Sequence, residues 1–208
     1  MLDPLYARVD AFFRDAAAAR PGAIACGPRC DGCCRVDLSV FPVEAERIAA
    51  AFAALPPRTR AAAARRAESG RHCAMLHPRR RQCVVYPARP LICRTHGLAI
   101  LADGRLDHCP LNYRDGPTDR ANVLVLDRVN EPLALADRLS GGTGARVRIA
   151  AIAAAAVALA CAGTGGGADT GSDASADPAP DVIADAIADS VTDPDAAADV
   201  TPRTPSTS

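Results

Sequence analysis

The placement of the cysteines constrains this chain more than any other feature. Eight of its nine cysteines lie between residues 26 and 109. Large apolar side chains are scarce: the four Phe and three Tyr all lie between Tyr6 and Tyr113, and much of the remaining apolar content is Ala, which buries little area. A small domain with so thin a core needs disulfides or a metal to stabilise it. The cysteines can supply either.

The N-terminal sequence indicates whether we expect disulfides or a bound metal. MLDPLYARVDAFF has acidic residues early and no uninterrupted apolar run, so it does not resemble a secretory signal. We therefore expect a cytoplasmic and reducing environment. Clustered cysteines in such an environment bind metal or perform redox chemistry more often than they form disulfides. Metal binding is the interpretation that we favour.

The cysteines divide into a compact group and a dispersed group. The compact group, in CGPRCDGCC, consists of Cys26, Cys30, Cys33 and Cys34. The dispersed group consists of Cys73, Cys83, Cys93 and Cys109. Eight thiols could complete two four-thiolate sites, or one iron–sulfur cluster with spare redox thiols. Zinc would give closed structural sites, whereas iron would give redox chemistry, and the small number of histidines slightly favours all-sulfur ligation of an iron–sulfur cluster.

The cysteine order resembles a known family. The pattern CxxxCxxCC, followed by CVVYPARPLICR and HCPLN, is similar to the YkgJ-like cysteine-cluster family of zinc- or iron-chelating domains. The resemblance covers about residues 20–115 and includes all eight cysteines. It implies that these eight are metal ligands, with zinc and an iron–sulfur cluster both open as the cofactor. It implies no particular reaction, substrate or partner.

Two other function classes compete with simple metal binding. Cys26, Cys30 and Cys33 have the spacing of the radical-SAM loop, and the cysteine family is similar to a flagellin lysine methylase. A small redox or SAM-dependent iron–sulfur enzyme, acting for example in protein methylation, is therefore the second hypothesis. Against it, Gly32 stands where an aromatic residue is usual, and the chain has no run of alternating strands and helices for a partial barrel.

The third hypothesis is a zinc module that binds nucleic acid. The run Arg79-Arg80-Arg81 is basic, but no aromatic residue is interleaved with it for base stacking. A solvated face explains these arginines equally well. Nucleic acid is therefore not expected as a partner.

Apolar periodicity predicts a small α-rich domain with a minor β component and irregular cysteine-rich loops. We expect helices over residues 3–20, 42–55 and 57–69, a short strand over 82–86, turns from there to 117, and a helix over 121–139. Pro132 is expected to break or kink that last helix, or to start a new one after Asn130.

Composition divides the chain into three parts. Residues 1–140 form the predicted cysteine-cluster domain, 141–168 a Gly- and Ala-rich linker, and 169–208 an acidic tail. The tail repeats Asp at every fourth position, which would stack like charges on a helix, so we predict disorder.

The linker has a second interpretation as a membrane attachment through residues 149–162. The uncharged span that begins at Ile149 is about as long as a bilayer requires, although it is mostly Ala. The run from Val157 to Cys161 also resembles a lipoprotein cleavage site, which hints at a fused reading frame. A linker helix that contacts nothing is the alternative, and Cys161 is then an ordinary buried side chain.

Other side chains near the cysteines have predicted supporting roles. Arg89 and Arg94 flank Cys93 and are expected to pair with the negative charge of a thiolate site. The four histidines are expected to lie around the ligands or at the surface rather than to bind metal. They are His72, His77, His96 and His108.

Overall fold

A computed structural model describes residues 2–27, 29–116 and 118–162, with side chains as far as residue 155. The predicted acidic tail, the end of the predicted linker and the Cys161 side chain lie outside the described residues.

The first three predicted helices are confirmed. They are α1 (Asp3–Ala19), α2 (Pro42–Ala53) and α3 (Pro57–Ser69), and each has a proline in its first two positions. A proline is favourable there because the first helical N–H groups have no partner within the helix. Gly70 ends α3 with a left-handed φ of 63°, a conformation that glycine adopts without a Cβ penalty.

The prediction of turns between residues 87 and 117 missed a helix and a sheet. The short helix α4 (Leu91–Thr95) precedes β4 (Ala99–Ala102) and β5 (Arg105–Asp107). Strand β4 pairs antiparallel with β5 and parallel with β6 (Val123–Val125), so β4 is the central strand. The strands are too short for their periodicity to be recognised, and β6 joins the sheet from a distant part of the chain.

The predicted strand at residues 82–86 is shorter than expected. Only β3 (Gln82–Cys83) is extended, and it pairs with β2 (Leu76–His77) in register Leu76↔Cys83. The chain then forms a 3₁₀ turn over Tyr86–Ala88. The hairpin places Cys83 opposite a strand that begins three residues after Cys73.

Helix α5 (Asp127–Leu139) continues through Pro132, so the predictions of a break there and of a new helix after Asn130 are wrong. The proline lies in the interior of the helix. The missing hydrogen bond would have been accepted by the carbonyl of Arg128. Both residues are exposed, so water can take the place of the missing donor.

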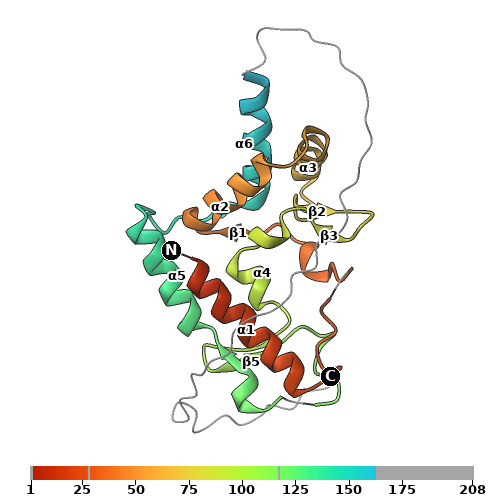
Figure 1. Ribbon diagram of the computed structural model, residues 1–208, viewed down its shortest axis with the longest axis vertical. Helices are drawn as coiled ribbons and strands as arrows, with labels where there is room; N and C mark the ends of the chain where they lie inside the picture. Colours follow the sequence, from red (N-terminus) through yellow and green to blue (C-terminus); the bar gives the residue numbers. More distant parts are fainter. Residues whose placement is uncertain (1, 28, 117, 163–208) are drawn as a thin grey trace, which may run out of the picture. The chain divides into compact units, whose positions relative to one another are not determined.

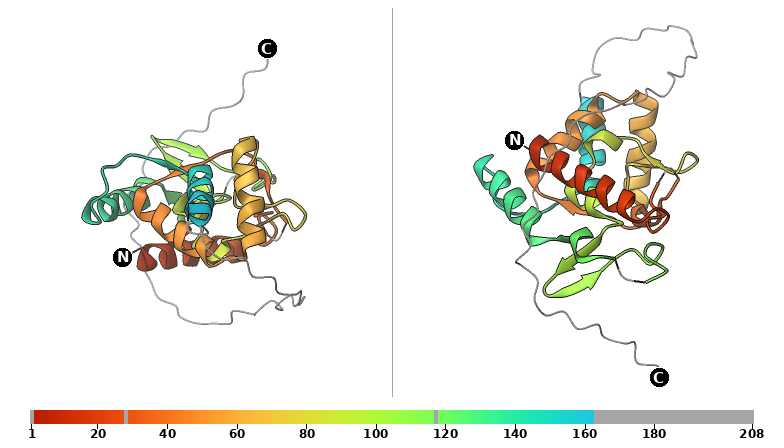
Figure 2. Two further views of the ribbon diagram at one scale, coloured as in Figure 1. Left: turned by 90° about the horizontal axis from the view of Figure 1, so that it is seen from above. Right: turned by 60° about the horizontal axis from the view of Figure 1, so that its bottom comes forward.

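The segment from residue 141 contains structure that packs into the domain. Strand β7 (Val147–Arg148) pairs with β1 (Ser39–Val40), and α6 (Ile149–Ala162) packs against α2 and α3 (Figures 1 and 2). Ile149, Ile152 and Ala153 are buried in the same core as Ile48 and Phe52. This part of the predicted linker therefore contributes to the cysteine domain. Among the described residues, no helix has the length and apolarity needed to cross a bilayer.

Two apolar clusters form most of the core. One lies among α2, α3 and α6 and includes Cys73. The other joins α1, α4 and α5 through Val9, Leu91 and Leu133. The loop from Arg20 to Leu38, with a 3₁₀ turn over Gly32–Cys34, carries the compact cysteine group beside both clusters.

Candidate metal centre

Cys33 lies close to cysteines from three distant segments. Its charge acts on the thiols of Cys73, Cys83 and Cys93. A hydrogen bond with the neighbouring Cys34 thiol, and then burial, raise the pKa of Cys33. The thiol group formed by Cys33, Cys34, Cys73, Cys83 and Cys93 is called the Cys73 group below.

Burial is the main cause of the raised pKa values of three members of the Cys73 group, Cys73, Cys83 and Cys93. It raises the pKa of Cys83 to about 11, and it also raises the pKa of Cys73 and of Cys93. The negative charge of Cys73 raises the pKa of Cys83 and of Cys93 further, and that of Cys83 also raises the pKa of Cys93. A bound cation would lower these raised pKa values, because it stabilises the thiolate form that binds metal.

The other three cysteines form a separate set, called the Cys26 group below. Burial raises the pKa of Cys26, a hydrogen bond from Asn112 lowers it, and the charges of Cys30, Cys109 and Cys33 raise it. Cys26 and Cys30 come from the compact loop, whereas Cys109 follows β5. Cys33 is the member of the Cys73 group that also acts on Cys26.

Asn112 and Gly97 position the side chain of Cys26. The Asn112 amide donates to the Cys26 sulfur at 3.4 Å and to the Gly97 carbonyl at 2.5 Å, and its oxygen accepts from the Ala25 N–H at 2.9 Å. Asn112 is 1% exposed. Gly97 has a φ of +103°, and a Cβ added there would lie 2.5 Å from the Cys26 sulfur. Only glycine fits this position without a shift of Cys26.

Polar contacts fix the compact loop to the β2–β3 hairpin. The Cys73 N–H donates to the Cys34 carbonyl at 2.8 Å. Asp31, which is 6% exposed, accepts from Arg81 at 2.6 Å and from Arg35 at 3.3 Å, and the Arg81 hydrogen bond holds its pKa below the usual range. Arg81 therefore has a partner within the domain.

Of the two arginines predicted to pair with a thiolate site, Arg89 acts on the thiols, whereas Arg94 pairs with the carboxylate of Asp10. The positive charge of Arg89 lowers the pKa of Cys33, Cys83 and Cys93, although less than burial raises each one. The Arg89 guanidinium lies 3.6 Å from the centre of the Tyr86 ring.

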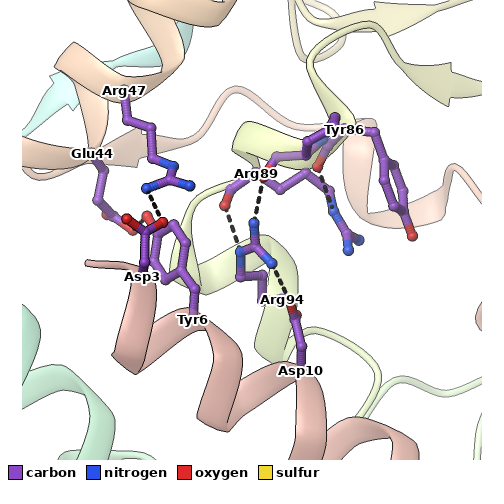
Figure 3. Close-up of polar contacts among 9 residues, drawn as sticks. Asp3, Tyr6, Asp10, Glu44, Arg47, Tyr86, Arg89 and Arg94 are labelled. Atoms are coloured by element: carbon purple, nitrogen blue, oxygen red, sulfur yellow. Dashed lines mark hydrogen bonds and ion pairs between the residues drawn. The ribbon is translucent and has the colours of Figure 1, made fainter. Parts of the chain in front are cut away.

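Arg94 is instead a structural residue (Figure 3). It donates to the carbonyls of Arg89 at 2.9 Å and Pro87 at 2.6 Å, pairs with Asp10 of α1, and lies over the Tyr6 ring. These contacts fix the turn that precedes Cys93 and orient the backbone of Arg89.

Glu44 joins three helices in the same region (Figure 3). Its Oε1 accepts from the Tyr6 hydroxyl of α1 at 3.0 Å and from the Leu91 N–H at the start of α4 at 2.7 Å. The residue is 2% exposed, and this burial raises the pKa of its carboxyl. Glu44 therefore positions α4, the helix that carries Cys93.

A cleft of about 540 Å³ borders the Cys26 group. Leu91, Leu98 and Leu133 supply apolar walls, and His96, His108 and Cys109 lie along the polar side. Cys109 is thus a member of a thiol group and a cleft residue at once. His72 and His77 do not line this cleft.

The thiols of each group influence one another, but their side chains are not arranged in the coordination geometry of a metal site. Among the described residues, which include all eight of these cysteines, no three His, Cys, Asp or Glu side chains are arranged to hold a metal ion. All eight are free thiols. Their chemistry suits zinc and iron, both of which accept thiolate ligands.

Three polar or glycine residues at the site were not predicted from the sequence: Asp31, Gly97 and Asn112. Asn112 lies in the HCPLN segment that carries the resemblance, so its proximity to Cys109 was the available signal. The others become recognisable only when the loops are placed beside one another.

Comparison with known proteins confirms the family resemblance. Residues 25–110 match the family model described as "CxxCxxCC: Putative zinc- or iron-chelating domain". This segment contains all eight clustered cysteines. No curated protein and no solved structure matches the chain.

Proposed function

We propose that the chain binds metal through the Cys73 group and the Cys26 group separately. The match of residues 25–110 to the family model described as "CxxCxxCC: Putative zinc- or iron-chelating domain" supports this proposal. The observation that carries this proposal is the proximity of Cys33 to Cys73, Cys83 and Cys93 across three segments. Buried thiols that repel one another as anions are stabilised when a cation neutralises them. The ligands are the eight clustered cysteines, and the metal is zinc or the iron of an iron–sulfur cluster.

The Cys73 group has the character of a closed site. It offers five sulfurs, of which Cys73 is buried and the other four are partly buried. Such a site excludes water and substrate, so its metal would stabilise the fold. Cys33-Cys34 supplies two neighbouring thiols, of which Cys33 also faces the Cys26 group.

The Cys26 group has the character of an open site. It offers three sulfurs, and the cleft borders one of them, Cys109. Catalytic metal sites commonly have three protein ligands and one position left for water or substrate. This observation favours a small redox or SAM-dependent enzyme as the second candidate function, with the Cys26 group as its metal centre.

Metal content of single-cysteine variants tests the two-group proposal. Cys73→Ser and Cys109→Ser are compared with wild type after anaerobic purification, and Cys161→Ser, outside residues 25–110, is the control. We expect Cys73→Ser and Cys109→Ser each to lose part of the bound metal, and Cys161→Ser to lose none. Cys73→Ser should also lose stability, because metal binding contributes to folding. If both variants retain the full metal content, the proposed ligands are wrong.

SAM cleavage separates the enzyme candidate from metal binding alone. The reduced, anaerobic wild-type protein is incubated with SAM, and its cleavage products are measured beside those of Cys109→Ser. Cleavage that requires Cys109 supports an enzyme. Retention of metal without any cleavage supports binding alone.

A further inference from the structure

Asp37 lies between the compact cysteine loop and β1, and only one of its two oxygens is paired. Oδ2 accepts from the Arg148 guanidinium, at 2.5 Å for Nε and with Nη2 as a second donor. The β1–β7 register places Ser39 opposite Arg148, which brings this arginine beside Asp37. The Asp37 side chain is 12% exposed.

The other oxygen, Oδ1, is buried and has no hydrogen-bond partner. It is the one such side-chain nitrogen or oxygen among the described residues that are not exposed. A buried carboxylate oxygen without a partner is destabilising, because it has lost its hydration without compensation. Arg148 contacts the other oxygen, Oδ2, so Oδ1 still lacks a hydrogen-bond donor or a cation.

The negative charge of Asp37 acts on the thiol of Cys73. After burial, the negative charge of Asp37 is the largest influence that raises the pKa of Cys73. The Cys73 N–H also donates to the Cys34 carbonyl at 2.8 Å, which holds the segment before Asp37 against Cys73. A carboxylate fixed beside a buried thiol repels the thiolate, and a cation between them would remove the repulsion.

We propose that Asp37 is a ligand, through Oδ1, of the metal held by the Cys73 group. The inference rests on the proposed function of that group. Zinc and mononuclear iron accept a mixture of thiolates and one carboxylate, whereas an iron–sulfur cluster is usually bound by thiolates alone. The Cys73 group therefore binds a mononuclear ion, and the Arg148 contact to Oδ2 orients the carboxylate toward it.

Binding of Co²⁺ to the full chain tests this assignment. Cobalt is used alone as the probe, because thiolate-to-cobalt absorption reports sulfur ligands and the visible ligand-field bands report the whole ligand set. The Asp37→Asn variant is compared with wild type and with Asp3→Asn, which breaks a different aspartate–arginine pair, that of Asp3 with Arg47 between α1 and α2. Cys73→Ser reports the thiolate contribution.

We expect Asp37→Asn to weaken Co²⁺ binding about 10–100-fold in competition with a chelator. The ligand-field bands of Asp37→Asn should shift while its thiolate absorption persists, and Asp3→Asn should match wild type. If Asp37→Asn has the Co²⁺ affinity and the ligand-field bands of wild type, Asp37 is not a ligand, but metal binding by the Cys73 group is not contradicted. Absence of thiolate absorption in wild type would overturn the proposed function and the assignment together.

X-ray absorption of the zinc-loaded wild type keeps the test decisive if Asp37→Asn does not fold. The assignment requires an oxygen ligand at about 2.0–2.2 Å beside sulfur ligands at about 2.3 Å. A shell of sulfur alone would refute it.

Discussion

Gly97 limits where the Cys26 sulfur can lie. Its φ is +103°, and the Cβ of any other residue at this position would lie 2.5 Å from that sulfur, which is closer than the two atoms can approach. Asn112 then fixes both partners, since its amide bridges the Gly97 carbonyl and the Cys26 sulfur. The geometry of the Cys26 group thus depends on two residues that are not themselves ligands.

The Gly97→Ala substitution should therefore weaken metal binding by the Cys26 group. The added methyl group displaces Cys26 and strains the backbone at once. Gly104→Ala is the matched control, because Gly104 also has a positive φ (+71°) but nothing within 4 Å of the added carbon. We expect chelator competition to remove metal more readily from Gly97→Ala than from Gly104→Ala. Equal metal retention in the two variants would contradict the claim that Gly97 leaves the space that the Cys26 sulfur needs.

Glu44 makes the stability of the fold depend on pH. Burial raises the pKa of its carboxyl above the ordinary value of 4.5, so the folded state holds a proton that the unfolded state has already released. Between the two pKa values the folded state binds more protons, and the contribution of Glu44 to stability therefore falls as pH rises.

The Glu44→Gln variant should remove this dependence. Glutamine retains an oxygen that can accept from Tyr6 and Leu91 but carries no charge. The free energy of unfolding of the variant, relative to wild type, should increase as pH rises through the window above 4.5. Urea denaturation at several pH values measures it, and Glu46→Gln, exposed on the same helix, is the control. A difference that does not change with pH would show that the Glu44 carboxyl is not perturbed.

At the scale of secondary structure, α6 contributes to the cysteine domain rather than to a separate segment. Ile149 is 2% exposed and Ile152 is 7% exposed, in the cluster that also contains Cys73. Burial of each such side chain contributes about 1.5–3 kcal/mol relative to exposure. Removal of β7 and α6 would expose this core and detach Arg148 from Asp37.

Truncating Ile152 to alanine should destabilise the domain by about 2–5 kcal/mol. The cost arises from lost apolar burial and from the cavity left among α2, α3 and α6. Leu139→Ala is the control, because Leu139 is 69% exposed at the end of α5. Thermal denaturation of the two variants measures the difference. An Ile152→Ala protein as stable as Leu139→Ala would mean that α6 does not pack into the core.

The sequence predicted those elements whose signals are local. Helices α1, α2 and α3 each have a proline in their first two positions, and α1 and α2 also carry apolar residues on one face, so local signals located them. The sheet could not be predicted in this way, because β6 pairs with β4 across an intervening loop. The role of α6 was also hidden, since an Ala-rich helix has the same composition whether it packs or not.

At the scale of the whole molecule, the sequence predicted the metal-binding character of the candidate site but not which cysteines lie together. The order of the cysteines predicted a resemblance to a family of zinc- or iron-chelating domains, and residues 25–110 match the model of that family. The division of the cysteines into two groups was not predictable from their spacing. Cys109 lies far from Cys26 in sequence but belongs beside it, and Asn112 and Gly97 bring the two segments together.

Metal content per chain, measured together with the visible spectrum after anaerobic purification, tests the central claim most directly. The claim is that the eight cysteines hold metal, with the Cys73 group and the Cys26 group as separate sites. The account predicts stoichiometric zinc or iron in the wild-type protein, with partial losses in Cys73→Ser and Cys109→Ser that add to the whole. A folded wild-type protein that holds no zinc or iron, and whose eight thiols all titrate as free cysteines, would contradict it.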